Sequence, residues 1–520
     1  MAWKIILWGS TLTVISYVAL QISNAEKGVM PVESLVFYNA ISAPPDSFDP
    51  LDFDAANNVF LGRLLYATPL EFDSNGLLTS SVLDKFEYLA ENKTLQFHLK
   101  SNLQYENGEP IRIEDVALAI QRMALSRPNF PVIEKISGLK GWLQQKYPLK
   151  GDLSGLHIDG DILTITFDEA VEHPLFRFAL ELFSIIPSSS IDLETAKLKG
   201  SRPPGSGYYK LVSGDLGQRK WEFERRNDSQ NLGMPQRIEM DVQSWSDALS
   251  SAARRRPQFS VVAGFGDVYL DPSLSSEIEK MNFKTVATPD AWHMVMKLNS
   301  ENGGFQKLEA RRTFITKLRL KLKEHYPKNV KLEESVFSKL LQGYVDYSDG
   351  KGSPSPLDTL SKDIVKEAFP SGLTWVGQEM KLPAIDDSIS ETCFYFGIDC
   401  KKLVRSEAVG KHYDLFVGLT GFWSYDPYGD IKMLFTPNLH KQLQDIAKDQ
   451  KVQSMLTDLN SPKVEEKSDL AKKLDKYLHD QYIYNVVAHF PFVFAYSDSS
   501  ATGEGIPQSG TLPYPWMFAR

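Results

Sequence analysis

The chain has 520 residues, of which 42% are hydrophobic and 24% are charged, which is typical of a globular protein. It is too long for one hydrophobic core, so we expect roughly two to four domains. The formal net charge of −9 argues against nucleic acid as a partner, because phosphate binding needs clustered Lys and Arg side chains.

Residues 1–25 have the pattern of a secretory signal peptide. Lys4 is the only charged residue, an apolar run covers residues 5–20, and residues 23–25 are small, as a cleavage site requires. An uncleaved membrane anchor is the alternative interpretation. No cysteine lies near the cleavage point, so we do not expect a lipid-anchored form. The pattern predicts an exported protein.

Residues 65–123 contain a strand, a turn and a helix start in close succession. Apolar and polar residues alternate over 95–100, which predicts a strand with one buried face. Residues 106–108 favour a turn, and from Ile113 onward apolar residues recur at helical spacing. Glu114 and Asp115 fall in the first helical turn, where acids complement the helix dipole. This position favours a helix-start role for the two acids over a catalytic one.

The rest of the chain shows a mixture of strands and helices. The predicted elements are, in order, a hairpin turn at Asp159-Gly160, a helix over 175–183, a loop over 200–207, strands at 209–211, 221–226 and 295–299, a helix over 305–322, a surface loop over 350–356, a helix around 470–477, and an apolar run over 486–495 broken by Pro491.

The two cysteines, Cys393 and Cys400, lie close together in the sequence. An exported chain allows a disulfide between them, and closing so short a loop contributes about 2–3 kcal/mol in the chain-entropy model. A metal site is poorly supported, because two thiols do not complete a zinc shell and no histidine lies between them.

The sequence contains no G-x-S-x-G, H-E-x-x-H or P-loop motif. Its nine histidines are scattered singly, and Asp386-Asp387 falls in an expected loop over 383–390 that faces solvent. A hydrolase that uses two carboxylates far apart in the sequence stays open as an alternative. The motif search therefore does not favour an enzyme, and we expect no cofactor and no metal.

The order of residues in 65–123 is similar to that of the family 5 solute-binding proteins of ABC importers. In that family a strand ends in Phe-x-Leu-Arg or Lys, a polar turn follows, and a helix opens with Asp-Val. The matching residues are Phe97, Leu99, Lys100, Gly108, Pro110, Asp115 and Val116. Residues 205–209 resemble the family's Gly-Thr-Gly-Pro-Tyr motif, from which Ser206 and Tyr208 depart. The resemblance extends over about residues 47–496 and is thin over 323–408.

This resemblance implies an α/β, two-lobed periplasmic-binding-protein fold with a hinge and an additional subdomain in the first lobe. The expected division is a signal peptide (1–25), a discontinuous lobe I (31–56, 185–268 and 488–520), the additional subdomain (57–184) and lobe II (269–487).

The resemblance further implies a periplasmic monomer that captures a small peptide or peptide-like solute by lobe closure. The protein would deliver this ligand to the membrane subunits of an ABC importer. One alternative is a sensor or chaperone-like peptide binder of the envelope that has no transporter. The other is a periplasmic hydrolase.

Two segments make up the candidate ligand site. Similar proteins line their cleft with the loop after the first strand, here Asn39, Ala40, Ile41 and Ser42, and the second segment supplies Phe422, Trp423, Tyr425 and Asp426. In peptide-binding members a tryptophan is followed by an aspartate that pairs with the peptide's amino terminus, and then by Asp-Pro. Asp426 lies three residues after Trp423 and directly before Pro427, so it matches both the binding and the structural aspartate. Both roles stay open.

Overall fold

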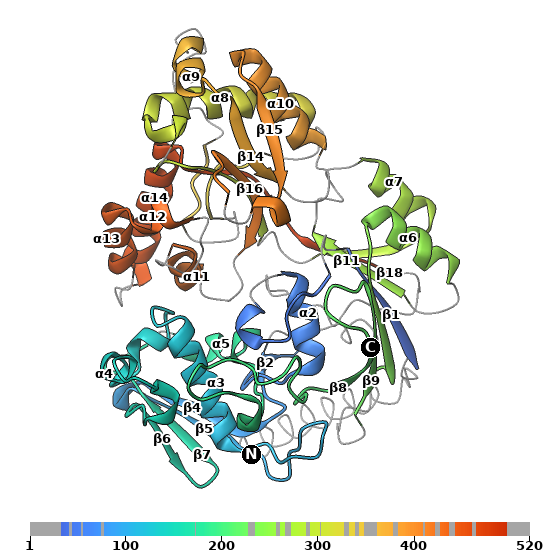
Figure 1. The fold of residues 1–520 in the computed structure, drawn as a ribbon, viewed down its shortest axis with the longest axis vertical. Coiled ribbons are helices and arrows are strands. Elements are labelled where there is room, and N and C mark those ends of the chain that lie inside the picture. Colours follow the sequence, from blue (N-terminus) through green and yellow to red (C-terminus); the bar gives the residue numbers. More distant parts are fainter. Residues whose placement is uncertain are drawn as a thin grey trace, which may run out of the picture.

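The chain forms two lobes of mixed helix and sheet, which Figure 1 shows one above the other. The computed structural model describes residues 33–40, 44–53, 56–73, 77–171, 173–226, 234–255, 260–265, 272–287, 292–301, 303–326, 332–337, 343–347, 361–377, 383–408, 411–421, 427–435, 443–459 and 464–496. The predicted signal peptide and the predicted loop over 350–356 lie outside these ranges. Within them, none of the helices has the length and apolar character needed to span a bilayer.

A seven-stranded sheet forms the centre of the first lobe. Its strands are, in spatial order, β12 (Lys284–Ala287), β18 (Phe492–Tyr496), β11 (Ser260–Phe265), β1 (Ser34–Asn39), β10 (Arg237–Val242), β9 (Lys220–Arg225) and β8 (Tyr209–Ser213). β11, β1 and β10 run parallel, and each of the other four strands pairs antiparallel with its neighbours.

β1 is apolar from Leu35 to Tyr38 because both faces of this sheet are covered. Successive side chains of a strand point to opposite faces. Leu35 and Phe37 accordingly join one hydrophobic cluster, and Val36 and Tyr38 join another. The helices α6 (Trp245–Arg254) and α7 (Pro272–Lys280) supply the cover on the second face.

An antiparallel four-stranded sheet forms an additional part of the first lobe. It consists of β4 (Leu83–Leu89), β5 (Thr94–Leu99), β7 (Ile162–Thr166) and β6 (Leu156–Asp159), with α4 (Leu139–Leu143) and the pair β2 (Glu71–Phe72) and β3 (Leu78–Thr79) nearby. Leu95 and Phe97 of β5 are fully buried, as the alternation predicts. They belong to the same hydrophobic cluster as Leu35 and Phe37 of β1, so the additional part and the main sheet share one core.

The helix predicted from Ile113 is α3 (Ile113–Ser126), and its start confirms the role expected for Asp115. One Asp115 carboxylate oxygen accepts a hydrogen bond from the Arg112 N–H at 3.0 Å, which closes the first turn. The other oxygen accepts from the Ser188 N–H, also at 3.0 Å. The carboxylate therefore caps a helix and holds a neighbouring loop.

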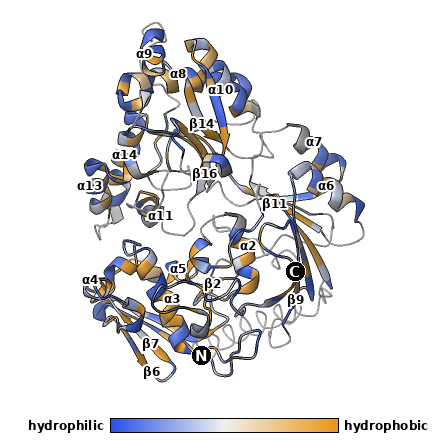
Figure 2. Cartoon of the chain, in the orientation of Figure 1, coloured by the Kyte–Doolittle hydropathy of each residue, from blue (hydrophilic) through white to orange (hydrophobic). Residues whose placement is uncertain are grey.

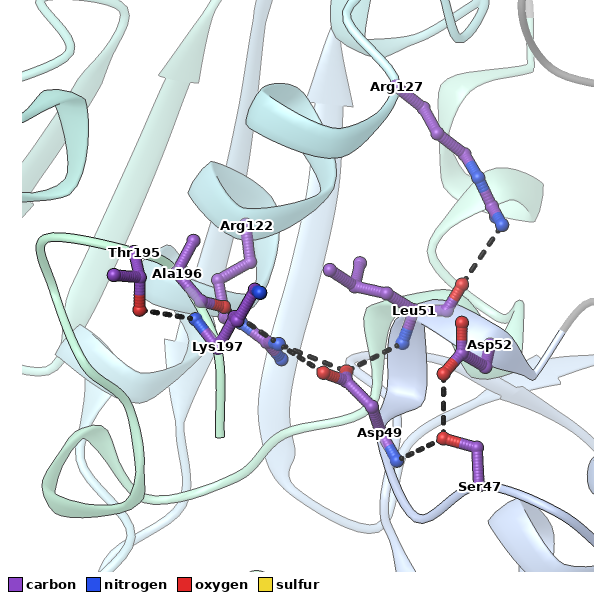
Figure 3. A network of polar contacts seen from close by, with 9 residues as sticks. All are labelled: Ser47, Asp49, Leu51, Asp52, Arg122, Arg127, Thr195, Ala196 and Lys197. Carbon is purple, nitrogen blue, oxygen red and sulfur yellow. Dashed lines mark hydrogen bonds and ion pairs between the residues drawn. The ribbon is translucent and has the colours of Figure 1, made fainter. Parts of the chain in front are cut away.

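The second half of α3 is tied to the loop after β1, as Figure 3 shows. One guanidinium nitrogen of Arg122 donates to both carboxylate oxygens of Asp49, at 3.0 and 2.8 Å, and also to the Ala196 carbonyl at 3.2 Å. Asp49 also accepts from the Leu51 N–H at 3.0 Å. Arg127 donates to the Leu51 carbonyl at 2.9 Å. These bonds fix the additional part against the main body of the first lobe.

The glycine-rich loop over 200–207 closes against the end of α2 (Ala56–Leu65). The Gly207 N–H donates to the Leu65 carbonyl at 2.8 Å, and the Ser206 hydroxyl accepts from the Ala67 N–H at 2.9 Å. A Cβ atom on Gly207 would lie 2.7 Å from the carbonyl carbon of Leu65 and from the nitrogen of Tyr66. Two backbone segments that are far apart in the sequence therefore touch where only glycine fits.

Replacing Gly207 with alanine is expected to lower the free energy of unfolding by about 1–3 kcal/mol, because the backbone of α2 must move away from the new methyl group. Gly200→Ala is the matched control, since a Cβ atom there meets nothing within 4 Å. We expect it to change stability by about 0.5 kcal/mol at most. Urea unfolding followed by circular dichroism measures both changes, and equal midpoints for the two variants would contradict the close approach.

The single helix predicted over 175–183 is wrong. The segment forms the short helix α5 (Pro174–Arg177) and a 3-10 turn (Glu181–Phe183). Between them Leu180 is extended, with φ −81° and ψ 142°. Arg177 and Glu181 each bind a buried partner elsewhere in the molecule. These tertiary contacts outweigh the local helical pattern.

A five-stranded sheet forms the centre of the second lobe. Its strands are, in spatial order, β15 (Cys400–Val404), β14 (Leu373–Gly377), β16 (Leu415–Gly421), β13 (Trp292–Leu298) and β17 (Tyr484–Phe490). One hydrophobic cluster joins a face of the sheet to α8 (Leu308–His325), α9 (Lys362–Ala368) and α10 (Pro383–Phe396). A second cluster joins the other face to α11 (Pro427–Leu434), α12 (Gln444–Ala447), α13 (Gln450–Asp458) and α14 (Val464–Gln481). Figure 2 shows hydrophobic and hydrophilic residues mixed along α8, α10 and α14, as in helices that bury one face.

Residues 383–390 form the first half of α10, so the loop predicted there is wrong. Pro383 is the first helical residue, a position that proline favours because its missing N–H needs no partner there. Asp386 accepts from the Lys402 ammonium at 2.7 Å instead of facing solvent alone. Cys393 and Cys400 form a disulfide that ties α10 to β15, with Cα atoms 6.1 Å apart.

The chain passes from the second lobe to the first at Pro491. β17 pairs with β13 in one sheet and β18 pairs with β11 in the other, which confirms the broken strand predicted over 486–495. The crossing between β12 and β13 falls in 288–291, outside the described residues. β12 lies in the sheet of the first lobe although the predicted lobe II begins at 269, and β17 reaches past its predicted end at 487. The residue boundaries of the lobes stay a prediction.

Candidate ligand-binding site

The first predicted segment begins at the carboxyl end of β1. Asn39 is buried, and its carbonyl oxygen accepts from the Gln243 N–H at 3.2 Å. The Ala40 N–H donates to the Ala263 carbonyl at 2.7 Å. β1, β10 and β11 are parallel, so their carboxyl ends share one edge, and open α/β sheets bind ligands at such an edge. Ile41 and Ser42 lie outside the described residues.

The second predicted segment connects β16 with α11. Its residues Phe422, Trp423, Tyr425 and Asp426 lie outside the described residues, but the elements on both sides are described. Gly421 ends β16 opposite Trp292 of β13, and Pro427 begins α11. The segment therefore joins a strand inside the second lobe's sheet to a helix that contacts the first lobe.

α11 packs on the second lobe with one face and on the first lobe with the other. Ile431 and Leu434 belong to a hydrophobic cluster of the second lobe. Met433, which projects from the opposite side of the helix, belongs to the cluster of the first lobe. Leu419 of β16 also packs against clusters of both lobes. The predicted segment thus lies between two elements that reach across the molecule.

Two ion pairs connect α11 with the first lobe. The Arg177 guanidinium donates to the Asp430 carboxylate at 2.6 Å, and only 3% and 1% of these side chains are exposed. The Lys432 ammonium donates to the Glu134 carboxylate at 2.5 Å, and both side chains are largely buried.

Sequence reasoning missed these four residues. The partners lie 253 and 298 positions apart, so no periodicity or spacing connects them. The one available signal is Arg177 itself, a charged residue inside the mostly apolar stretch 174–186. A charge in such a stretch needs a buried partner, but the sequence does not say which one.

A polar pocket inside the first lobe is lined by side chains that are already paired. Arg63 forms an ion pair with Glu181, and the Tyr208 hydroxyl donates to Glu71 at 2.5 Å. Burial raises the pKa of the Glu71 carboxyl. The pocket has room for little more than one water molecule, so it does not accept a peptide or a sugar.

Across the part of the chain that the structure describes, no group of three or more His, Cys, Asp or Glu side chains is arranged to hold a metal ion. The disulfide also occupies both thiols of the chain.

Comparison with known families decides the identity of this fold. Residues 77–315 match the model for the bacterial extracellular solute-binding proteins, family 5 (middle region). The match covers a little under half of the chain, and over these residues the chain is similar to family 5 of the extracellular solute-binding proteins. The family predicted from residues 65–123 is therefore confirmed, and its members are binding proteins. No curated protein matches this chain by sequence.

Solved structures resemble this chain over almost its whole length. OppA from Haemophilus influenzae, in complex with the peptide RPPGFSPFR, has a TM-score of 0.74 at 15% identity, covering 94% of this chain and 98% of OppA. The periplasmic binding protein DppA from Helicobacter pylori, in complex with the peptide STSA, has a TM-score of 0.73 at 16% identity, covering 95% and 99%. AgaA from A. tumefaciens R10, in complex with agropinic acid, has a TM-score of 0.71 at 13% identity, covering 92% and 97%. These likenesses confirm the predicted two-lobed α/β fold of periplasmic binding proteins.

Proposed function

We propose that this protein captures a peptide or peptide-like solute between its two lobes and delivers it to the membrane subunits of an ABC importer. The observation that carries the proposal is the full-length likeness to binding proteins solved with the peptides RPPGFSPFR and STSA. A ligand that contacts both lobes gains its full binding energy only when they are close together. Such a ligand therefore shifts the protein toward the closed arrangement by a hinge movement.

The proposed ligand contacts come from both lobes. The first lobe supplies Asn39, Ala40, Ile41 and Ser42, and the second supplies Phe422, Trp423, Tyr425 and Asp426. Asp426 would accept the ammonium group of a peptide, since a charged hydrogen bond is about twice as strong as a neutral one. The aromatic side chains would form apolar walls that tolerate varied ligand side chains. The positions of β1, β16 and α11 support this assignment, because β1 ends at a sheet edge suited to ligands and the other two contact both lobes.

We also propose that residues 1–25 direct export and are then removed. The match of residues 77–315 to a family of extracellular proteins supports this assignment. The mass of the intact protein isolated from the periplasm distinguishes cleavage after residue 25 from a retained anchor.

Addition of a bound peptide is expected to raise the melting temperature by several degrees. A ligand at 100 times its dissociation constant stabilises the native state by about 2.7 kcal/mol. The probes are STSA, RPPGFSPFR and a library of di- to pentapeptides, and native mass spectrometry of the isolated protein detects any ligand already present. No shift with these peptides or with cell extract, together with a bare native mass, would overturn the proposal.

The role of Asp426 has its own matched control, N-acetylated STSA, which lacks the terminal ammonium group. If Asp426 anchors that group, acetylation weakens binding to the wild type but not to Asp426→Asn. If Asp426 is structural, acetylation has the same effect on both proteins. Release of shorter peptides during incubation would indicate a hydrolase, and peptide uptake unaffected by loss of the protein would indicate a binder without a transporter.

A further inference from the structure

We propose that α11 carries a closure latch, formed by Asp430 and Lys432 with their partners Arg177 and Glu134 in the first lobe. Figure 1 shows α11 on the side of the second lobe away from β11 and β18, near which the chain crosses at Pro491. The crossing and the latch would hold the two lobes together from opposite sides. This proposal concerns the lobes themselves and does not depend on the identity of the ligand.

The helix geometry explains how α11 serves both lobes. Residues are 100° apart around an α-helix, so Ile431 and Leu434 share one face. Met433 lies on the opposite side, and Asp430 and Lys432 flank it at the two borders of the apolar face, so all three reach the first lobe. The sulfur of Met433 also accepts a contact from the Arg177 guanidinium at 3.7 Å. Asp430 and Lys432 are two residues apart and point in nearly opposite directions. The two ion pairs therefore bind α11 to the first lobe on two different sides of the helix.

The order of the charges makes the latch selective for one arrangement of the lobes. The first lobe presents a cation at Arg177 and an anion at Glu134, and α11 presents the complementary anion and cation. The Lys135 ammonium, which forms a closer ion pair with Glu169, also lies 3.8 Å from Glu134. A shifted docking of α11 would bring like charges together, which is costly at a buried contact.

The ion pair of Arg177 and Asp430 is buried, and this burial determines how it affects closure of the lobes. Separation of the lobes exposes Arg177 and Asp430 to water, which hydrates both charges. Closure removes that water, and the pairing of the two charges largely compensates the loss. Removing only one partner leaves the other charge buried and unpaired, which is strongly unfavourable. The intact ion pair therefore permits closure of the lobes, whereas a variant that keeps only one of the two charges opposes closure.

The latch also has a direct connection along the chain to the proposed ligand site. Asp430 is four residues beyond Asp426, on the helix that starts at Pro427. A contact of the segment 422–426 with ligand would thus restrain the same helix that binds the first lobe. This link, unlike the latch, rests on the proposed function.

A zero-length carbodiimide tests the latch in the protein without added ligand. The reagent activates a carboxylate, and an adjacent lysine forms an amide with it as the reagent leaves as a urea. Lys432 and Glu134 are close enough to be joined, and mass spectrometry of the digested protein detects the linked peptides. Lys150 and Glu194, which are 2.5 Å apart within the first lobe, provide the internal reference. We expect the cross-lobe amide in the wild type.

Arg177→Met is expected to reduce the ratio of cross-lobe to reference product at least tenfold, because Asp430 then opposes closure. Arg177→Met combined with Asp430→Leu is expected to restore the ratio to within about threefold of the wild type, since no unpaired charge remains. X-ray scattering should report a larger radius of gyration for the single variant alone. Absence of the cross-lobe product in the wild type, or an unchanged ratio in Arg177→Met, would overturn the latch.

Misfolding is separated from opening by the reference product, which depends only on the first lobe, and by circular dichroism. The cross-linking experiment uses no peptide, so its result does not depend on the melting experiment. The latch and the proposed ligand are therefore tested independently.

Discussion

Replacement of Asp445 with alanine is expected to destabilise the second lobe by about 3–5 kcal/mol. The Lys297 ammonium lies 2.8 Å from one Asp445 oxygen, and only 6% and 3% of these side chains are exposed. The other oxygen accepts from the N–H and the hydroxyl of Ser300, at 3.1 and 2.9 Å. Alanine would leave a buried ammonium without its counter-charge and two donors without an acceptor. Urea unfolding followed by circular dichroism measures the loss.

Two variants distinguish the destabilisation caused by a buried, uncompensated charge from the destabilisation that any substitution in this lobe would cause. Lys297→Met combined with Asp445→Leu removes both charges and should cost less than Asp445→Ala alone, because an apolar pair replaces a buried ion pair at little net cost. Asp386→Ala is the matched control in the same lobe, since Asp386 contacts Lys402 at 2.7 Å but is partly exposed. We expect it to cost about 1 kcal/mol at most. A wild-type unfolding midpoint for Asp445→Ala would mean that water reaches Lys297.

The features that the sequence predicted well are those determined by neighbouring residues. The alternation over 95–100 depends only on which face of one strand is buried, and β5 has that face against the core. Asp115 caps α3 from within its own first turn, and Gly160, with φ +58°, turns the hairpin within two residues. Each of these signals needs no knowledge of the rest of the fold.

The features that the sequence missed are determined by distant partners. The stretch 175–183 breaks into two short turns where Arg177 and Glu181 bind partners elsewhere in the molecule. The second lobe's contact with the first depends on pairs 253 and 298 residues apart. For the ligand site, the types of residue in 422–426 suggested a role, but no local pattern indicated that the next helix contacts both lobes.

The prediction of a loop over 383–390 was wrong for a different reason. Pro383 and the acids after it are common in loops, but they are equally common in the first turn of a helix. What decides between them is the apolar face that continues to Phe396, since Ile385, Ile389 and Cys393 pack into the second lobe's core. A longer window would have favoured the helix.

The free energy of unfolding is expected to depend on pH because of one buried acid, Asp475 of α14. Its carboxylate accepts from the Val336 N–H at 2.6 Å, the Ser335 hydroxyl at 2.9 Å and the Tyr347 hydroxyl at 3.1 Å. These three donors favour the ionised form. Burial nevertheless outweighs them and raises the pKa of Asp475 from 3.8 to about 7. The native protein therefore keeps this proton at pH values where the unfolded chain has lost it.

The sign of the effect follows from that difference in bound protons. Between pH 4 and pH 7 the native state binds more protons than the unfolded state, so the free energy of unfolding falls as the pH rises. The contribution is complete below the unfolded pKa and is lost by about pH 7, above which both states are ionised. From pH 4.5 to pH 8 the expected loss from Asp475 alone is about 3 kcal/mol.

The variant Asp475→Asn isolates this contribution, because asparagine keeps an acceptor oxygen but does not ionise. The stability of the wild type relative to Asp475→Asn should fall by about 3 kcal/mol between pH 4.5 and pH 8, measured by urea unfolding at each pH. Asp469→Asn is the matched control on the same helix, since the Asp469 side chain is 75% exposed and gains no such environment on folding. A constant difference between the wild type and Asp475→Asn across this range would show that Asp475 is ionised in the native state. The three donors would then outweigh burial.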